Sequence, residues 1–186
     1  MPQAPELRVP YWIDAKGEER AALTLKELGT GYKVIFAFKA ECPGCHSFGF
    51  PAMKTIYDGL KDKPVGMAVV HTAFDDDPRN NQDRIAEMQE KYSLAIPFGH
   101  DPKVGETYPT FMTDYRTRGT PFFTIIDPNG EIIFSDFRLD ANKVVEVLGQ
   151  QAAYLIKANH SVSVRTFTSR LSAFLSLDPA PGPATK

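Results

Sequence analysis

The feature that most constrains this fold is a pair of cysteines that follows a buried strand. Residues 34–38 read Val-Ile-Phe-Ala-Phe, a continuous apolar run typical of a central strand covered on both faces. The chain then reads Cys42-Pro43-Gly44-Cys45, and these are its only two cysteines. From Cys45, apolar residues recur every four positions to about Leu60, which predicts a helix. We therefore expect both thiols at a junction between a strand and a helix.

Such a junction favours thiol chemistry. A helix begins with unpaired backbone N–H groups and the positive end of its dipole, and both stabilise a thiolate. Two intervening residues let the second sulfur reach the first, so the dithiol can attack a disulfide and resolve the mixed disulfide internally. Cys42 is the expected nucleophile and Cys45, one turn inside the helix, the expected resolving thiol. The alternatives are half of a zinc site, with His46 adjacent, or two inert thiols.

The composition excludes several other classes of protein. Hydrophobic residues make up 42% of the 186 residues, charged residues 24%, and the formal net charge is −2. These values are ordinary for a globular domain and argue against a nucleic-acid-binding protein. No apolar run is long enough to span a membrane, and two cysteines neither complete a Cys₄ zinc site nor staple a small secreted scaffold. No nucleotide fingerprint occurs, so we expect no dissociable cofactor and no metal.

Hydrophobic patterning along the chain predicts alternating strands and helices in an α/β fold with a mixed central sheet flanked by helices. The further strands are expected at residues 65–70 and near 95–98, with a hairpin at 122–126 and 131–137. The helices are expected at residues 45–60 with a kink at Pro51, from Pro78 to about Tyr92 with Asp77 as N-cap, and after Asp140. Residues 6–14 and 20–25 are expected to form an N-terminal hairpin, and residues 99–117 a long irregular connection.

Three segments carry a resemblance to a known family. They read VPYWIDAKGEERAALTLKELG, KVIFAFKAECPGC and RGTPFFTIIDPNGEIIF. With this spacing of cysteines, Gly-Thr-Pro, strand and Asp-Pro-Asn-Gly turn, residues 7–157 resemble the thioredoxin superfamily, and most closely its TlpA/ResA-like branch of thiol-disulfide oxidoreductases, which is related to the peroxiredoxins. The expected organisation is a thioredoxin-like domain at 1–157 with an N-terminal extension, a helical C-terminal extension at 158–177 and a disordered tail at 178–186.

The resemblance implies an activity and a substrate site. It implies a thiol-disulfide oxidoreductase that acts on a protein disulfide or dithiol together with an upstream redox partner, without a cofactor. It also implies a cis peptide bond between Thr120 and Pro121, which would face the cysteines and pair with a bound polypeptide. Together with Pro43 and Gly44, these two residues are the expected substrate-binding positions.

Three positions depart from the family pattern. Glu41 stands where family members commonly have Trp, Phe36 where thioredoxin has a buried Asp, and Phe48 where ResA-like proteins have Glu. The usual proton-handling carboxylate near the resolving thiol is therefore missing. Glu41 would oppose thiolate formation by its charge, Lys39 would offset it, and these two residues and His46 are the candidate modulators of the site.

Several functional alternatives stay open at this stage. The branch resemblance favours a reductase over an oxidase. A copper metallochaperone would use the two cysteines with His100 as a late ligand, and a peroxiredoxin-like peroxidase is disfavoured because Ile35 and Lys39 replace the Pro and Thr of that family. A partner-docking module built on residues 158–177 is a further alternative. The N-terminus has no signal peptide, which fits a cytoplasmic protein, or a periplasmic one if the chain is a trimmed mature form.

Overall fold

The computed structural model describes residues 1–157, so the C-terminal segments expected at 158–177 and 178–186 lie outside the described residues. The strands are β1 (Tyr11–Ile13), β2 (Glu19–Arg20), β3 (Tyr32–Phe38), β4 (Val65–Ala73), β5 (Phe98–Pro102), β6 (Phe122–Ile126) and β7 (Ile132–Asp136). The helices are the π-helical turn η1 (Cys45–Gly49), α1 (Phe50–Leu60), α2 (Asp83–Lys91), α3 (Thr110–Asp114) and α4 (Ala141–Lys157).

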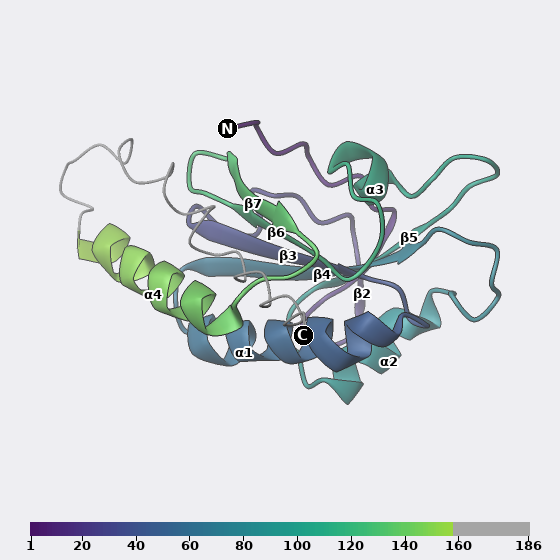
Figure 1. Ribbon diagram of the computed structural model, residues 1–186, viewed down its shortest axis with the longest axis horizontal. Helices are drawn as coiled ribbons and strands as arrows, with labels where there is room; N and C mark the ends of the chain where they lie inside the picture. Colours follow the sequence, from purple (N-terminus) through teal and green to yellow (C-terminus); the bar gives the residue numbers. More distant parts are fainter. Residues whose placement is uncertain (158–186) are drawn as a thin grey trace, which may run out of the picture.

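All seven strands form one mixed sheet in the order β2-β1-β5-β4-β3-β6-β7. Strands β3, β4 and β5 are parallel, whereas β1, β6 and β7 run antiparallel to their neighbours. In Figure 1, α1, α2 and α4 lie on one face of the sheet, and α3 lies with the N-terminal segment on the other. The α/β fold expected from the sequence is confirmed, and the parallel strands end together at the edge where ligands bind in open sheets of this kind.

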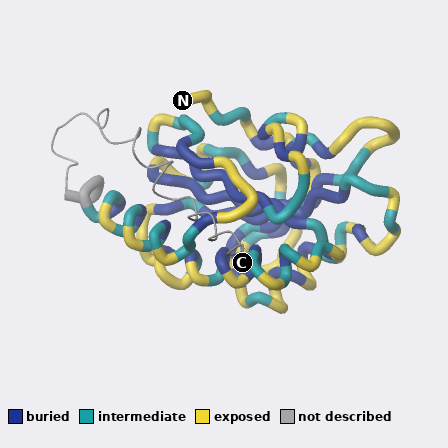
Figure 2. Tube along the Cα trace, viewed as in Figure 1, coloured by how far each residue is buried: buried dark blue, intermediate teal, exposed yellow. Residues whose placement is uncertain are grey.

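The core explains why β3 reads as an unbroken apolar run. Val34, Phe36 and Phe38 belong to the hydrophobic cluster that packs under α1 and α4. Ile35 and Ala37 belong to the cluster on the opposite face, below α3 and the N-terminal segment. Both faces of the strand are therefore covered, and Figure 2 shows the central strands as a continuous buried layer.

The helix after the cysteines differs from the expected one. A kink at Pro51 was expected within one long helix, but the chain instead forms η1 first, and α1 begins at Phe50. Pro51 thus lies in the first turn of α1, where a missing N–H costs no helical hydrogen bond. The expected kink is replaced by a change of helix type just after Cys45.

The expected start of α2 is also wrong. The Asp77 carboxylate does not cap a helix but accepts hydrogen bonds from the backbone N–H and guanidinium of Arg79, at 3.0 Å and 2.6 Å. The helix starts only at Asp83, whose N–H donates to the side-chain oxygen of Asn81 at 3.1 Å. Local side-chain hydrogen bonds therefore hold residues 78–82 in turns.

The positions of β5 and α3 also differ from the prediction. Strand β5 lies later than the predicted one, and α3 occupies part of the predicted irregular connection. The last helix begins as expected, because the Asp140 carboxylate accepts the N–H of Lys143 at 3.1 Å. Among the helices of the described chain, none has the length and apolar character needed to cross a membrane.

Candidate active site

The two thiols lie where β3 passes into η1, as the sequence predicts. Cys42 is half-buried, Cys45 is fully buried, and both are free thiols. The backbone N–H of Cys45 donates to the Cys42 Sγ at 3.3 Å, and the Cys42 thiol contacts the carbonyl oxygen of Thr120 at 3.3 Å. The accessible sulfur therefore lies between the start of the helix and the loop before β6.

Burial and hydrogen bonding shift the pKa values of the two thiols in opposite directions. Burial opposes ionisation of Cys42, but hydrogen bonds with the Cys45 thiol, with Thr120 and with backbone N–H groups outweigh it and lower its pKa. Burial is also the largest influence on Cys45, and the neighbouring Cys42 adds to it, so the pKa of Cys45 rises to about 12. Cys42 is consequently the thiol that ionises first.

The loop opposite the cysteines contains a cis peptide bond between Thr120 and Pro121, which confirms the bond implied by the resemblance. Pro121 packs against the start of the helix. A Cβ atom added at Gly44 would lie 3.3 Å from the Pro121 Cδ, and one at Gly49 would lie 3.0 Å from its Cβ and 2.6 Å from the Phe36 Cζ. Glycine at position 49 therefore lets the helix approach the loop and the sheet closely.

Charged residues on one side of Cys42 are all ion-paired, and we call Lys39, Glu41, Asp75, Arg79 and Arg84 the paired side. Glu41 lies 3.4 Å from Arg79 and 3.5 Å from Arg84. Lys39 pairs with Asp75 and does not offset Glu41, contrary to the expectation. The two arginines do so instead, and only the folded loop between β4 and α2 brings them to Glu41.

His46 holds the cysteine loop in place through both ring nitrogens. Its Nε2 lies 2.6 Å from the carbonyl oxygen of Ala40, and its Nδ1 lies 2.6 Å from the hydroxyl of Tyr92. A carbonyl oxygen only accepts, so in the neutral ring Nε2 carries the proton and Nδ1 accepts from Tyr92. His46 thus connects the segment before Cys42 to the end of α2.

Comparisons with known proteins were made at the level of both sequence and structure. No protein-family profile and no curated protein sequence matches the chain. A solved thioredoxin-like superfamily protein matches with 26% identity and a TM-score of 0.68, covering 87% of this chain and 99% of its own. A thiol-disulfide isomerase from Corynebacterium glutamicum matches with 23% identity and a TM-score of 0.66, covering 81% and 97%. The protein has the thioredoxin-like fold.

A more distant neighbour has the same fold. The thioredoxin domain of a thiol-disulfide oxidoreductase from Bacteroides vulgatus matches this thioredoxin-like protein with 18% identity and a TM-score of 0.56. Together the neighbours show the thioredoxin-like fold, and two nearby cysteines in this chain fit the CxxC pattern.

Two of the three positions that depart from the family pattern, Phe36 and Phe48, take part in aromatic packing. The Phe36 ring stacks on Phe123 with centroids 4.8 Å apart and meets the edge of Phe50 at 5.1 Å. Phe48 also meets the edge of Phe123, at 6.3 Å. Among the hydrogen bonds of residues 1–157, none joins a carboxylate to either thiol. The surroundings of Cys45 are therefore apolar, which is the physical cause of its raised pKa.

A buried histidine pair lies behind the paired side, and sequence reasoning missed it. His71 and His100 face each other across β4 and β5, with their Nδ1 atoms 3.0 Å apart. The Nε2 of His71 lies 3.4 Å from the Asn80 side-chain oxygen, and the Asn80 amide donates to Asp75 at 2.8 Å. The only signal in the sequence was that each histidine lies in or next to an expected strand.

The described residues contain no group of three His, Cys, Asp or Glu side chains arranged to hold a metal ion. In particular, His100 is engaged by His71 and does not complete a three-ligand cluster with the two cysteines. The arrangement expected for a copper metallochaperone is thus not formed within residues 1–157.

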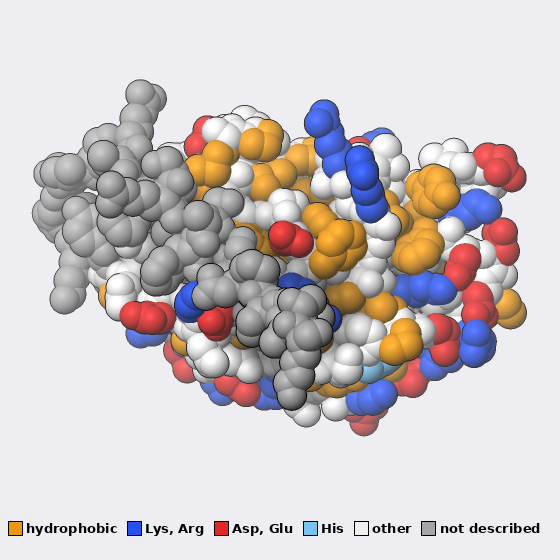
Figure 3. Space-filling model, viewed as in Figure 1, with side chains coloured by type: hydrophobic (Ala, Val, Ile, Leu, Met, Phe, Trp, Pro, Cys, Tyr) orange, Lys and Arg blue, Asp and Glu red, His pale blue; other side chains and the backbone are white. Residues whose placement is uncertain are grey.

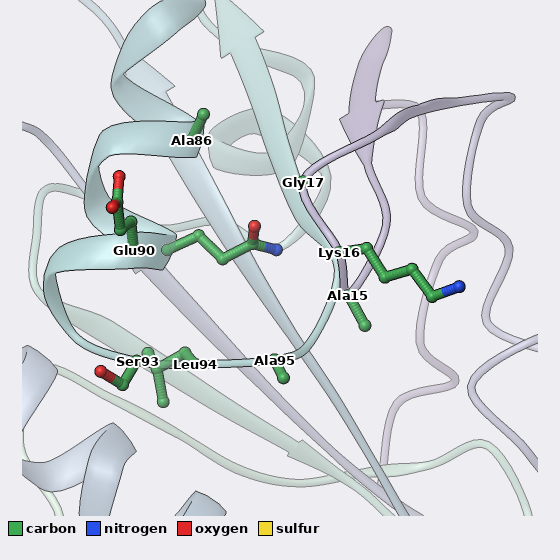
Figure 4. Close-up of a pocket in the computed structure, with 9 residues that line it drawn as sticks. Ala15, Lys16, Gly17, Ala86, Glu90, Ser93, Leu94 and Ala95 are labelled. Atoms are coloured by element: carbon green, nitrogen blue, oxygen red, sulfur yellow. The ribbon is translucent and has the colours of Figure 1, made fainter.

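A separate hollow of about 510 Å³ lies between residues 15–17 and the C-terminal part of α2. In Figure 4, Lys16 points away from this hollow, and Ser93, Leu94 and Ala95 lie along its rim. Its central amide, Gln89, donates to the carbonyl oxygens of Asp14 and Ile96 at 2.7 Å and 2.8 Å. No thiol lines the hollow, and its buried donor is already satisfied.

Proposed function

We propose that this protein is a thiol-disulfide oxidoreductase that reduces protein disulfides through the Cys42–Cys45 dithiol. The observation that carries the proposal is the contrast between the thiols: Cys42 is accessible and has a lowered pKa, whereas Cys45 is buried and has a pKa of about 12. A thiolate is the species that attacks a disulfide, so Cys42 is the nucleophile and Cys45 the resolving thiol.

The reaction proceeds by two exchanges. The Cys42 thiolate attacks one sulfur of the substrate disulfide, forms a mixed disulfide and releases the other substrate sulfur as a thiolate, which takes up a proton. Cys45 then loses its proton and attacks the Cys42 Sγ, which forms the Cys42–Cys45 disulfide and releases the second substrate thiolate. Two electrons pass to the substrate, and an upstream dithiol restores the reduced protein.

Capping of Cys42 also prepares the second exchange. The Cys42 sulfur raises the pKa of Cys45 both through its hydrogen bond and through its charge. In the mixed disulfide Cys42 carries no charge, so the charge contribution to the raised pKa of Cys45 disappears. The resolving thiol therefore ionises more readily after the first exchange than before it.

The loop at Thr120 and Pro121 supplies the docking edge for the substrate. The Thr120 carbonyl lies 3.3 Å from the Cys42 Sγ, so a polypeptide that pairs with this backbone brings its own sulfur to Cys42. Pro43 and Gly44 complete the surface around the nucleophile. This is a strand-pairing mode of recognition, in which backbone hydrogen bonds provide affinity without specifying sequence.

Trapping experiments test the assignment of roles. Cys45→Ser is expected to accumulate a mixed disulfide with a substrate protein, because Cys42 attacks and nothing resolves the adduct. Cys42→Ser is the matched control and is expected to trap nothing. Trapping that requires Cys45 and not Cys42 would reverse the assignment, and absence of trapping and exchange in every variant would contradict the function itself.

The reduction potential of the Cys42–Cys45 pair tests whether the protein acts as a reductant or as an oxidant of its substrates. We expect a value nearer that of thioredoxin, about −270 mV, than that of the oxidant DsbA, about −120 mV. Equilibration of the purified protein with glutathione buffers of known ratio measures it. A value near that of DsbA would keep the dithiol chemistry but make the protein an oxidant.

A further inference from the structure

Two arginines next to the proposed docking edge have no partner in the described part of the chain. Arg116 and Arg118 are exposed, and neither takes part in an ion pair or hydrogen bond with residues 1–153. Lys39, on the other side of Cys42, pairs with Asp75, and Arg138 lies over the Phe48 ring, 5.4 Å from its centroid. Arg118 lies two residues before Thr120, so an unbalanced positive charge stands beside the position where a substrate chain would pair.

A pocket of about 310 Å³ lies at the same place. Its lining residues come from the segment before α3, from α3 and from the loop that follows, and are Tyr108, Met112, Thr113, Thr117 and Arg118. Tyr108 is 60% exposed although it is a large aromatic side chain, so one wall of the pocket is an apolar surface open to solvent. Figure 3 shows basic side chains standing beside hydrophobic ones on this face.

One lining residue, Thr117, has a hydroxyl that is buried from solvent. Thr117 is only 7% exposed, and its Oγ1 is buried without a hydrogen-bond partner. A buried polar group without a partner is costly, and few occur in folded proteins. The accessible part of the pocket thus combines an exposed aromatic wall with an unpaired guanidinium, which together suit an apolar stem that ends in a carboxylate.

The spacing along the chain identifies which part of a substrate would enter. Alternate residues of an extended chain lie on the same face, about 7 Å apart. If a substrate pairs with Thr120 and presents its cysteine to Cys42, its side chain two residues away reaches the neighbourhood of Arg118. A glutamate at that place would bring its two methylene groups against Tyr108 and Met112, and its carboxylate to Arg118.

Resting on the proposed function, we propose that this pocket selects substrate polypeptides that carry an acidic side chain two residues from the reacting cysteine. Arg118 is the specificity-determining residue. The backbone of Thr120 accepts any sequence, whereas the pocket discriminates by charge. The substrate class is therefore a disulfide set in an acidic segment.

Disulfide-linked peptides that differ at one position test the proposal. One set of peptides carries Glu, Gln or Lys two residues before the cysteine. A second set carries the same three residues two residues after it. With the wild-type protein, we expect the Glu peptide in at least one direction to exceed the Gln peptide by about fivefold in kcat/KM, as for a partly exposed ion pair. The Lys peptide should be the poorest. The difference should lie in KM, because the pocket binds the substrate but does not touch the reacting sulfurs.

Variants assign the effect to the pocket. Arg118→Ala should abolish the preference for Glu over Gln, and Arg118→Lys should retain part of it. Lys63→Ala is the matched control, since it removes one exposed positive charge before the start of β4, at the opposite end of the strand from the cysteines. It should leave the preference unchanged.

The outcomes separate this proposal from the function on which it rests. Equal rates for the Glu and Gln peptides, or an equal loss for all peptides in Arg118→Ala, would overturn the specificity pocket and leave the exchange activity standing. Absence of Cys42-dependent exchange with every peptide would instead overturn the function. Oxidised glutathione forms a separate arm, and an Arg118-dependent preference for it over the Glu peptide would assign the pocket to a small carboxylated disulfide and contradict a polypeptide occupant.

Discussion

The charged residues on the two sides of Cys42 differ in whether they form ion pairs within the protein. On the paired side, Glu41 is held by two arginines and Lys39 by Asp75, so the charges nearest the cysteines are balanced within the protein. On the other side, which we call the open side, Arg116 and Arg118 have no partner among the described residues. Balanced charges fix a local geometry, whereas an unbalanced charge attracts a ligand. The difference separates the part of the site that holds the thiols from the part that meets the substrate.

Further contacts connect the paired side to a buried pair of histidines. Asp75 links Lys39 to Asn80, and Asn80 contacts the buried His71–His100 pair. This chain of contacts joins the cysteine loop to the loop between β4 and α2. On the open side, the buried Asp101 carboxylate accepts hydrogen bonds from Thr110 and Phe111 at the start of α3, whereas the buried Thr117 hydroxyl is unpartnered.

The largest expected effect is the dependence of the free energy of unfolding on acid pH, which tests the support beneath the paired side. Burial, and for His71 also its partner His100, lowers the pKa of His71 to about 3 and that of His100 to about 4, against an unfolded value of 6.5. Below pH 6.5 the unfolded chain therefore binds protons that the folded protein does not, and the free energy of unfolding falls as the pH falls toward 4. The slope is about 1.4 kcal/mol per pH unit for each histidine. Denaturant unfolding at several pH values measures it.

The histidine pair itself supplies the control. The double variant His71→Phe, His100→Phe should lose most of this slope between pH 6.5 and 4, whatever its stability at neutral pH. Carboxylates elsewhere still titrate in the variant, so their contribution is subtracted by the comparison. An unchanged slope would show that the pair does not stay neutral in the folded protein.

Gly49→Ala should be the next largest disturbance, because it removes the close packing that both sides share. The added methyl would lie 2.6 Å from the Phe36 ring and 3.0 Å from Pro121. Overpacking of this kind costs about 1–3 kcal/mol. Thermal or denaturant unfolding should show the loss, and the exchange rate should fall as the loop at Thr120 moves from Cys42.

Gly149→Ala is the matched control, since it adds the same methyl within a helix. There the nearest atom is the Leu60 Cδ2 at 3.7 Å, an ordinary contact, so the change should stabilise α4 by up to about 1 kcal/mol. If both variants lost stability equally, the tight packing at Gly49 would not be responsible.

The sequence predicts the centre of the site better than its sides. An apolar run followed by the Cys-Pro-Gly-Cys motif places the thiols correctly at the end of β3, because strand patterning and local chain order determine that junction. The hairpin of β6 and β7 also follows from its turn signal. The cis peptide bond at Thr120 required the family resemblance, since the residues alone fit a trans turn equally well.

The charge pairing could not be predicted from the sequence. Arg79 and Arg84 lie far along the chain from Glu41, and they reach it only because residues 78–82 form turns and not the expected helix. The His71–His100 contact likewise depends on the register between β4 and β5. Tertiary geometry decides both contacts, and no periodicity in the chain encodes them.

Glu41→Gln and Arg79→Ala should move the pKa of Cys42 in opposite directions. Loss of the Glu41 charge leaves its two arginines unbalanced beside the thiolate, so the pKa falls, whereas loss of Arg79 makes it rise. Solvent screening keeps each shift below about 1 unit. The ultraviolet absorbance of the thiolate as a function of pH measures it. Arg116→Ala removes the same charge from the open side and should leave the pKa nearly unchanged; a shift as large as that of Arg79→Ala would erase the distinction between the sides.

A change in salt concentration should have the smallest effect. It should alter kcat/KM for an acidic peptide on the open side but not the pKa of Cys42 beside the paired side. The ion pairs of Glu41 span 3.4 Å and 3.5 Å, well inside the screening length of about 8 Å at physiological ionic strength, so the pKa of Cys42 should change little. Attraction of an acidic peptide to Arg118 acts over longer distances, so its kcat/KM should fall about twofold on a tenfold rise in salt. The peptide with Gln in place of Glu controls for general effects on exchange. A rate for the acidic peptide that follows the Gln peptide at every salt concentration would mean that the open side makes no electrostatic choice among substrates.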